Sequence, residues 1–219
     1  MSYKSNIIRF AVLCAVFQSL ALSPVVSQTA ETLFISMPEE LMPSISENIR
    51  QEMSELFKSG LNSEIENNFE DTCKVLSLTD DYLKIKNGSG MMEMIVLTLA
   101  NDSKVICLIQ TDCVPVCDSY IEFYSLKWKQ LDASLFITPA EKAHFVKKEF
   151  SPDDNRMQNA LVPLDISLMK FSYDNEKRQL YQYFETPKYL NESEMKAVKP
   201  YLSSEPAVFV WNKMRFELM

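Results

Sequence analysis

The five cysteines are the residues of this chain whose type and spacing most directly suggest chemistry. They are Cys14, Cys73, Cys107, Cys113 and Cys117. A thiolate can bind zinc or act as a nucleophile, and two thiols can form a disulfide. Zinc sites usually combine several cysteines or histidines at short spacing. The Cys113 and Cys117 pair has no second pair nearby, and the only histidine, His144, is distant in sequence. The sequence therefore predicts no metal site.

Disulfides are the use of the last four cysteines that we expect, and four cysteines allow three pairings. Along a straight strand Cys113 and Cys117 would lie ~13 Å apart, which is too far for a bridge. Pro115, between them, favours a turn that brings them together. Cys73 and Cys107 each lie in a strand-like run and could pair across neighbouring strands. The disulfide candidates are therefore Cys113, Cys117, Cys73 and Cys107.

Groups for covalent or acid–base catalysis are few. Nothing around the cysteines favours a hydrolase that pairs one of them with His144. The carboxylate pairs Asp80–Asp81 and Asp153–Asp154 resemble what glycosidases use, but aspartates are also common in turns and at helix starts. The chain has three glycines, so no phosphate-binding loop of the usual spacing can form. We predict no catalytic residue and no cofactor.

Aromatic residues are the remaining candidates for a binding site. Five of them lie in segments with strand character: Tyr120, Tyr124, Tyr181, Tyr183 and Trp211. If some of these shared an exposed face, they would make a platform for a protein or a glycan. Alternating aromatic residues in strands more often pack in a core. We therefore treat the five as a candidate binding face, with core packing as the alternative.

The N-terminus has the layout of a secretory signal peptide. A positively charged start and an apolar run over residues 7–17 precede Val25 and Ser27, which occupy the −3 and −1 positions of a cleavage site before Gln28. The apolar run is shorter than the roughly 20 residues that span a membrane. We therefore expect a signal peptide at residues 1–27 and an exported protein, periplasmic, at the cell surface or secreted, with no integral membrane span after cleavage. An uncleaved anchor is the alternative.

Composition limits the partners of the exported part. Residues 1–27 hold two of the 22 basic side chains and none of the 30 acidic ones, so residues 28–219 have a formal net charge of −10. Phosphate backbones repel such a chain, and we expect no nucleic acid partner. Hydrophobic residues make up 47% of the sequence, which is enough for a core. We interpret residues 28–219 as a single domain, with a subdivision near residues 138–160 as the alternative.

Three apolar runs between Met91 and Trp128 are the centre of the expected fold. They are rich in Ile, Val, Leu, Tyr and Phe, and short turn-forming clusters separate them. This pattern predicts consecutive antiparallel strands. Further strands are expected at residues 73–78 and 82–86, in a hairpin over residues 164–184, and in a final pair over residues 207–218.

Helical spacing is clearest near the N-terminus. Apolar residues recur along one face of a predicted helix: Leu41, Ile45, Ile49, Met53 and Phe57. Pro43 lies near its beginning, so a main helix that begins at Pro43 with a separate turn before it is the alternative. Residues 28–35 are expected as an extended lead-in, and a shorter helix is expected after Pro139. The predicted fold class is α+β, a mainly antiparallel sheet of about seven to nine strands built as a meander of hairpins. The N-terminal amphipathic helix packs on one face, and short helices lie between strands.

Three stretches of the sequence resemble a family of exported Bacteroidales proteins defined only as a domain of unknown function. The first is residues 36–43 (SMPEELMP), and the second runs from residue 106 to Trp128. The third joins residues 186–190 (TPKYL), residues 199–202 (KPYL) and the strand that ends at Trp211. The resemblance covers most of residues 28–219. It implies a compartment and a fold, and none of its motifs implies an active site.

The sequence therefore favours a non-catalytic binding or interaction protein of the periplasm or cell surface. Its partner would be an unknown protein or glycan. The alternative is a hydrolase that acts on envelope or host-derived polymers through paired carboxylates.

Overall fold

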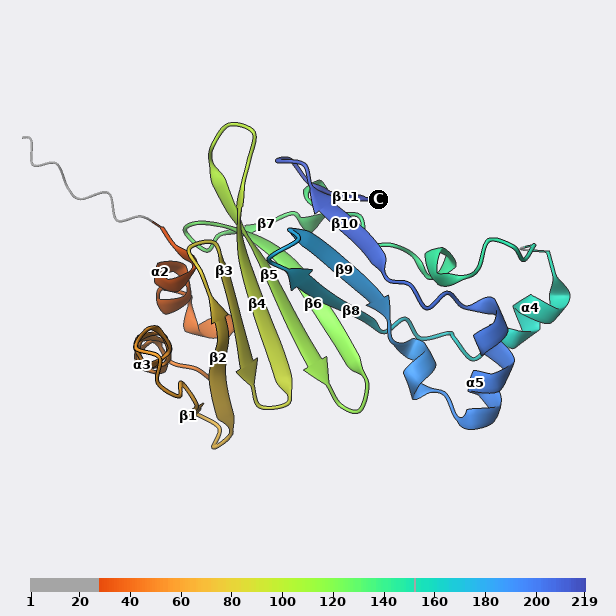
Figure 1. The fold of residues 1–219 in the computed structure, drawn as a ribbon, viewed down its shortest axis with the longest axis horizontal. Helices are drawn as coiled ribbons and strands as arrows, with labels where there is room; N and C mark the ends of the chain where they lie inside the picture. The colour runs from red at the N-terminus through yellow and green to blue at the C-terminus, as the bar shows by residue number, and fades with distance from the viewer. Residues whose placement is uncertain (1–27, 152) are drawn as a thin grey trace, which may run out of the picture.

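The computed structural model describes residues 28–151 and 153–219, and the predicted signal peptide at residues 1–27 lies outside the described residues. The described chain forms three layers (Figure 1). Helices α2 (Ala30–Ile35) and α3 (Glu47–Lys58) cover one face of a seven-stranded sheet, and a four-stranded sheet packs against the other face. The α+β class and the mainly antiparallel pairing predicted from the sequence are confirmed.

The large sheet is a meander in which each strand pairs antiparallel with the next. Its strands are β1 (Ile65–Glu66), β2 (Thr72–Leu78), β3 (Tyr82–Asn87), β4 (Gly90–Thr98), β5 (Lys104–Cys113), β6 (Cys117–Ser125) and β7 (Gln130–Leu131). The small sheet has the order β11-β10-β9-β8. Its strands are β8 (Met169–Asp174), β9 (Gln179–Phe184), β10 (Ala207–Trp211) and β11 (Phe216–Leu218). The sequence predicted one sheet. Two form because the long segment between β7 and β8 carries the chain to another layer.

The core under the helices is built by the N-terminal part of the chain. Phe34 of α2 and Met53 of α3 are fully buried there. Burying a side chain of this size stabilises the fold by roughly 1.5–3 kcal/mol. Arg50 of α3 is also buried, and its guanidinium donates to the carbonyl oxygens of Met37 at 2.6 Å and Ile45 at 3.2 Å. These bonds fix the segment between the two helices against α3.

Two N-terminal elements differ from the sequence prediction. The helix predicted over residues 41–57 begins at Glu47, and the 3-10 turn η2 (Glu39–Leu41) precedes it as a separate element. Residues Ala30–Ile35 form a helix and not an extended lead-in. Thr29 explains this helix start. Its hydroxyl accepts the N–H of Thr32, and the Thr32 hydroxyl accepts the N–H of Thr29, which is a capping box.

The core between the two sheets is aromatic. Phe123 of β6 stacks on Phe136 with ring centroids 4.7 Å apart, and Trp211 of β10 packs against Phe216 at 5.2 Å. The Trp211 indole N–H donates to the carbonyl oxygen of Thr98 at 2.8 Å, so its one polar group is satisfied. This core holds the small sheet over the large one and places β8 beside β6.

Candidate functional site

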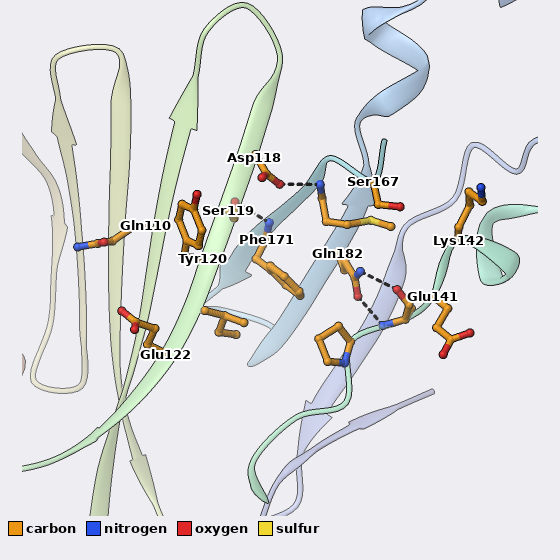
Figure 2. A pocket seen from close by; sticks show the side chains of 14 residues that line it. Gln110, Asp118, Ser119, Tyr120, Glu122, Glu141, Lys142, Ser167, Phe171 and Gln182 are labelled. Atoms are coloured by element: carbon orange, nitrogen blue, oxygen red, sulfur yellow. Dashed lines mark hydrogen bonds between the residues drawn. The ribbon is translucent and has the colours of Figure 1, made fainter. Parts of the chain in front are cut away.

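A cleft of about 700 Å³ lies beside strand β6, and the segment of residues 139–142 faces β6 across it (Figure 2). Five consecutive residues of β6 line the cleft: Asp118, Ser119, Tyr120, Ile121 and Glu122. Successive side chains of a strand point to opposite faces of its sheet. Five consecutive residues can therefore line one space only if that space lies against the edge of the strand.

Along this stretch, no strand within residues 28–151 and 153–219 pairs with the outer edge of β6. β5 pairs with β6 over its whole length, whereas β7 pairs with it only at Phe123 and Tyr124. In an antiparallel ladder, alternate residues point their backbone N–H and C=O to one side. The backbone N–H and C=O of Ser125 both form hydrogen bonds on the β7 side. The backbone N–H and C=O groups of the odd-numbered β6 residues therefore point away from β5. The N–H and C=O groups of Ser119 and Ile121 therefore face the cleft, where no described strand pairs with them.

A buried glutamine fixes the wall opposite β6. The Oε1 of Gln182 accepts the N–H of Ala140 at 2.8 Å, and its Nε2 donates to the carbonyl oxygen of Ala140 at 2.9 Å. This pair of bonds imitates strand pairing and fixes Ala140 against β9. The helix predicted after Pro139 is for this reason only the 3-10 turn η4 (Lys142–Phe145).

One edge of β8 likewise has no paired strand among the described residues, but side chains of the large sheet bond to it. Three N–H groups on this edge have acceptors: Met169 donates to Asp118 Oδ1 at 2.9 Å, Phe171 to Ser119 Oγ at 3.0 Å, and Tyr173 to Glu93 Oε2 at 3.0 Å. Figure 2 shows the first two of these bonds. The donors of β8 are therefore occupied, while the backbone groups of β6 next to them remain open to the cleft.

Glu93 of β4 joins the two sheets from a buried position. Its Oε2 accepts the hydroxyl of Tyr82 at 2.7 Å and the N–H of Tyr173, and its Oε1 accepts the hydroxyl of Ser172 at 3.1 Å. Lys84 adds an ion pair at 3.2 Å. Burial, and after it the neighbouring Glu93 carboxylate, raise the pKa of Tyr82 well above its ordinary value. A side chain with four partners belongs to the framework that joins the two sheets.

The cleft is acidic. Asp118, Glu122 and Glu141 line it, and Lys142 is the one basic residue among its lining residues. The Lys142 ammonium donates to the carbonyl oxygen of Leu164 at 2.9 Å, which turns it away from β6 (Figure 2). A cation in the cleft would therefore meet more negative than positive charge.

Two of these carboxylates already have protein partners. Both oxygens of Glu122 accept hydrogen bonds, from the Tyr124 hydroxyl at 3.0 Å and from Gln130 Nε2 at 2.8 Å. Asp118 uses one oxygen to accept the N–H of Met169. Glu141 is exposed. The bonds to Glu122 and Asp118 hold both ends of the open stretch of β6 in place.

The structure does not gather the five predicted aromatic residues on one face. Tyr120 is 64% exposed and lines the cleft, whereas Tyr124, on the same face of β6, is 3% exposed in the core under the helices. Tyr181 and Tyr183 of β9 stack at 6.3 Å, next to buried residues that point to the opposite face. Trp211 packs in the core between the sheets. The core-packing alternative thus describes Tyr124 and Trp211, and of the five only Tyr120 belongs to the cleft.

The cysteines divide into one bonded pair and two free thiols. Cys113 and Cys117 form a disulfide, with their Cα atoms 3.9 Å apart, that closes the β5–β6 hairpin at the start of β6. Cys73 and Cys107 are buried and free. Cys73 belongs to the core under the helices and Cys107 to the core between the sheets, on opposite faces of the large sheet. The second disulfide considered from the sequence therefore does not form.

Two of the aspartates considered for catalysis have structural roles. Asp81 forms an ion pair with Arg178 at 2.6 Å, and Asp154 caps helix α4 (Asn155–Ala160) by accepting the N–H of Arg156. His144 is exposed, and the hollow that it lines contains no cysteine. Within residues 28–151 and 153–219, no three His, Cys, Asp or Glu side chains gather as a metal site would require. No helix in these ranges is long and apolar enough to cross a membrane.

Comparison with known proteins identifies the family. A family model described as "Protein of unknown function (DUF3256)" matches residues 22–216. The chain belongs to this family. A solved structure similar to this DUF3256 chain is a domain of an uncharacterised protein from Porphyromonas gingivalis W83. It is 26% identical, its TM-score is 0.77, and the match covers 86% of this chain and 98% of that one. No curated protein matches the sequence. The family resemblance predicted from the sequence is confirmed.

Sequence reasoning singled out Tyr120 but missed the residues that shape the cleft. Gln182 lies between Leu180 and Phe184 on the inward face of β9, where an apolar residue is expected. A polar residue at such a position indicates a buried hydrogen-bond partner, although its partner is 42 residues away in sequence. Ser119 and Asp118 gave no comparable signal, because their acceptor roles depend on how two sheets meet.

Proposed function

We propose that this protein is an exported, non-catalytic binding protein that holds an extended ligand in the cleft beside β6. The observation that carries the proposal is the stretch of five consecutive β6 residues, with open backbone groups, that lines one side of the cleft. Five strand residues span roughly 16 Å, which suits an extended polymer better than a compact molecule. Tyr120 adds an exposed aromatic ring at the same place.

The signal peptide expected at residues 1–27 supports export, to the periplasm, the cell surface or the medium. The disulfide between Cys113 and Cys117 supports the same compartment, because disulfides persist where the surroundings are oxidising. The ligand is accordingly sought among the proteins and glycans of the envelope or its surroundings.

A hydrolase acting through carboxylates is the second candidate, because three carboxylates line the cleft. A glycosidase needs one carboxyl group free to give a proton and another free to attack or to activate water. Both oxygens of Glu122 and one oxygen of Asp118 are engaged with protein donors. We therefore favour binding, and product formation from a probe would favour the hydrolase instead.

The test is a nuclear magnetic resonance titration of the ¹⁵N-labelled chain with two probes. One is a hexapeptide of alternating Lys and Val with blocked ends, and the other is a linear hexamer of N-acetylglucosamine. We expect one probe to shift the amide signals of residues 118–122. Tyr120→Ala should then weaken binding about fivefold to thirtyfold, since it removes an exposed ring from the site.

Tyr189→Ala is the matched control. Tyr189, in the 3-10 turn η5 (Thr186–Tyr189), is 59% exposed and does not line the cleft, so its truncation should leave the affinity unchanged. If neither probe moves the signals of residues 118–122 at millimolar concentration, the proposed function is wrong.

A further inference from the structure

We propose that the ligand is a basic polypeptide segment that binds as an additional β-strand on the open edge of β6. The inference rests on the proposed function and names the ligand class for the same cleft. It begins from the backbone groups of Ser119 and Ile121. These two residues offer two N–H donors and two C=O acceptors in a row, which is the pattern that an added strand pairs with.

Strand β7 already shows the arrangement further along the same edge. It pairs antiparallel with β6 at Phe123 and Tyr124 and ends there. A peptide beside residues 118–122 would continue the line of β7 towards the disulfide hairpin. A glycan in the same place would contact side chains and the Tyr120 ring, but it would not reproduce the regular backbone bonds that this edge presents.

A single strand, and not the edge of a second sheet, is the occupant that we infer for the cleft. Its far wall, residues 139–142, is held in place by the two bonds between Gln182 and Ala140. A second copy of this chain that paired edge to edge would bring a whole sheet, with side chains on both faces, into this wall. A single extended peptide needs only the width of one strand, about 4.8 Å from β6.

Charge selects a basic segment. Three carboxylates line the cleft, the ammonium of Lys142 is bonded to the Leu164 carbonyl, and residues 28–219 have a net charge of −10. Lysine or arginine side chains on an added strand would lie near Glu122 and Glu141. Opposite charge also speeds encounter between the partners, and this effect weakens as the salt concentration rises.

The deciding experiment uses the blocked Lys-Val hexapeptide as the probe and amide hydrogen exchange of the full chain as the readout. We expect exchange at the amides of Ser119 and Ile121 to slow by at least about tenfold at saturating peptide, because their N–H groups become bonded. The amide of Tyr120 points towards β5, so its exchange should change much less.

Two modified peptides test the backbone pairing directly. One carries N-methyl groups on its lysine residues only, and the other carries them on its valine residues only. Alternate N–H groups of an edge strand face its neighbour, so one of these peptides should bind at least about tenfold more weakly and the other should bind like the parent peptide. If both bind like the parent peptide, strand addition is wrong.

Charge is tested with matched variants of the protein. Glu141→Lys, in the cleft, should weaken binding of the Lys-Val peptide by about threefold to tenfold at low salt. Glu52→Lys makes the same charge change on the exposed face of α3 and should have little effect. A Glu-Val hexapeptide should bind more weakly than the Lys-Val peptide, and the reverse order would overturn the basic ligand.

The outcomes separate this inference from the proposed function. If the N-acetylglucosamine hexamer shifts residues 118–122 and no peptide does, the cleft is a binding site and the polypeptide inference is wrong. If neither class of probe reaches the cleft, both are wrong.

Discussion

Strands β6 and β8 meet at the cleft, and neither has a paired strand of the described chain on the edge that lies there. The backbone groups on the two edges nevertheless differ in their partners. Three N–H groups of β8 are bonded by side chains of Asp118, Ser119 and Glu93. Over residues 118–122, no strand of the described chain pairs with the outward backbone groups of β6. An exposed edge invites pairing with other chains, and folded proteins usually cover it. The contrast indicates that the fold itself satisfies the donors of β8, whereas the outward backbone groups of β6 beside the cleft are left unpaired.

The largest expected effect on stability comes from removing the buried acceptor of the β8 edge, Glu93. Glu93→Ala removes one acceptor with four partners and leaves Lys84 and the N–H of Tyr173 without it. We expect a loss of roughly 3–5 kcal/mol in the free energy of unfolding, because breaking a buried charge network leaves uncompensated groups. Urea denaturation followed by circular dichroism measures it.

Glu217→Ala, at an exposed position of β11, is the control and should change stability by less than about 0.5 kcal/mol. If Glu93→Ala costs no more than this control, Glu93 does not join the sheets as described.

The wall opposite β6 gives the next largest effect. Gln182→Leu keeps the size of the side chain but leaves the N–H and C=O of Ala140 without partners. Each unsatisfied buried group costs about 1–3 kcal/mol, and we expect a total near 2 kcal/mol, since the loop can partly relax. The same loosening should weaken binding of the Lys-Val peptide.

Gln51→Leu, on the exposed face of α3, serves as the matched substitution and should leave both stability and peptide binding nearly unchanged. Unaltered peptide binding in a destabilised Gln182→Leu variant would mean that the wall does not shape the site.

Ser119 contributes to both edges, because its side chain bonds to β8 and its backbone belongs to the open edge of β6. One substitution can therefore test the two roles separately. Its hydroxyl accepts the N–H of Phe171 at 3.0 Å and bonds Thr111 at 2.8 Å, whereas its backbone faces the cleft. Ser119→Ala should cost about 1–2 kcal/mol in stability, through the unbonded Phe171 N–H, and should leave peptide affinity within about twofold. Equilibrium unfolding and the peptide titration test the two halves. A large loss of affinity with little loss of stability would show that the hydroxyl, not the backbone, recognises the ligand.

The sequence predicted what depends on local pattern. The apolar runs between Met91 and Trp128 became β4, β5 and β6, and the turn at Pro115 brought Cys113 and Cys117 together. These elements need only periodicity and turn residues close in sequence. The Thr29–Thr32 capping box is equally local, but the short helix that it begins has too little periodicity to be predicted.

The cleft depends on contacts that local pattern does not contain. Gln182 reaches Ala140 across 42 residues, and Asp118 reaches Met169 across 51. Tyr120 and Tyr124 look equivalent in the sequence, since they share one face of β6. The position of the helices decides that one is exposed and the other buried. A single sequence therefore predicts the strands that carry the site, but not the edge that remains open.

Tyr124 lies in the part of β6 that pairs with β7. Substituting it should have the smallest effect on stability, because the effect appears only at alkaline pH. Burial, and then the hydrogen bond to Glu122, raise its pKa to about 12 from an ordinary value of 10.0. Below pH 10 the folded and unfolded chains both keep this proton, so the group adds no pH dependence. Between pH 10 and pH 12 the unfolded chain releases the proton first, and the fold loses stability as the pH rises. Tyr124→Phe should reduce that loss, measured by urea denaturation from pH 8 to pH 12. Between pH 7 and pH 9 the difference in stability between variant and parent should stay constant. If both proteins lost the same stability at alkaline pH, Tyr124 would be exposed to solvent like the part of β6 that lines the cleft. The difference between the two parts of β6 would then not exist.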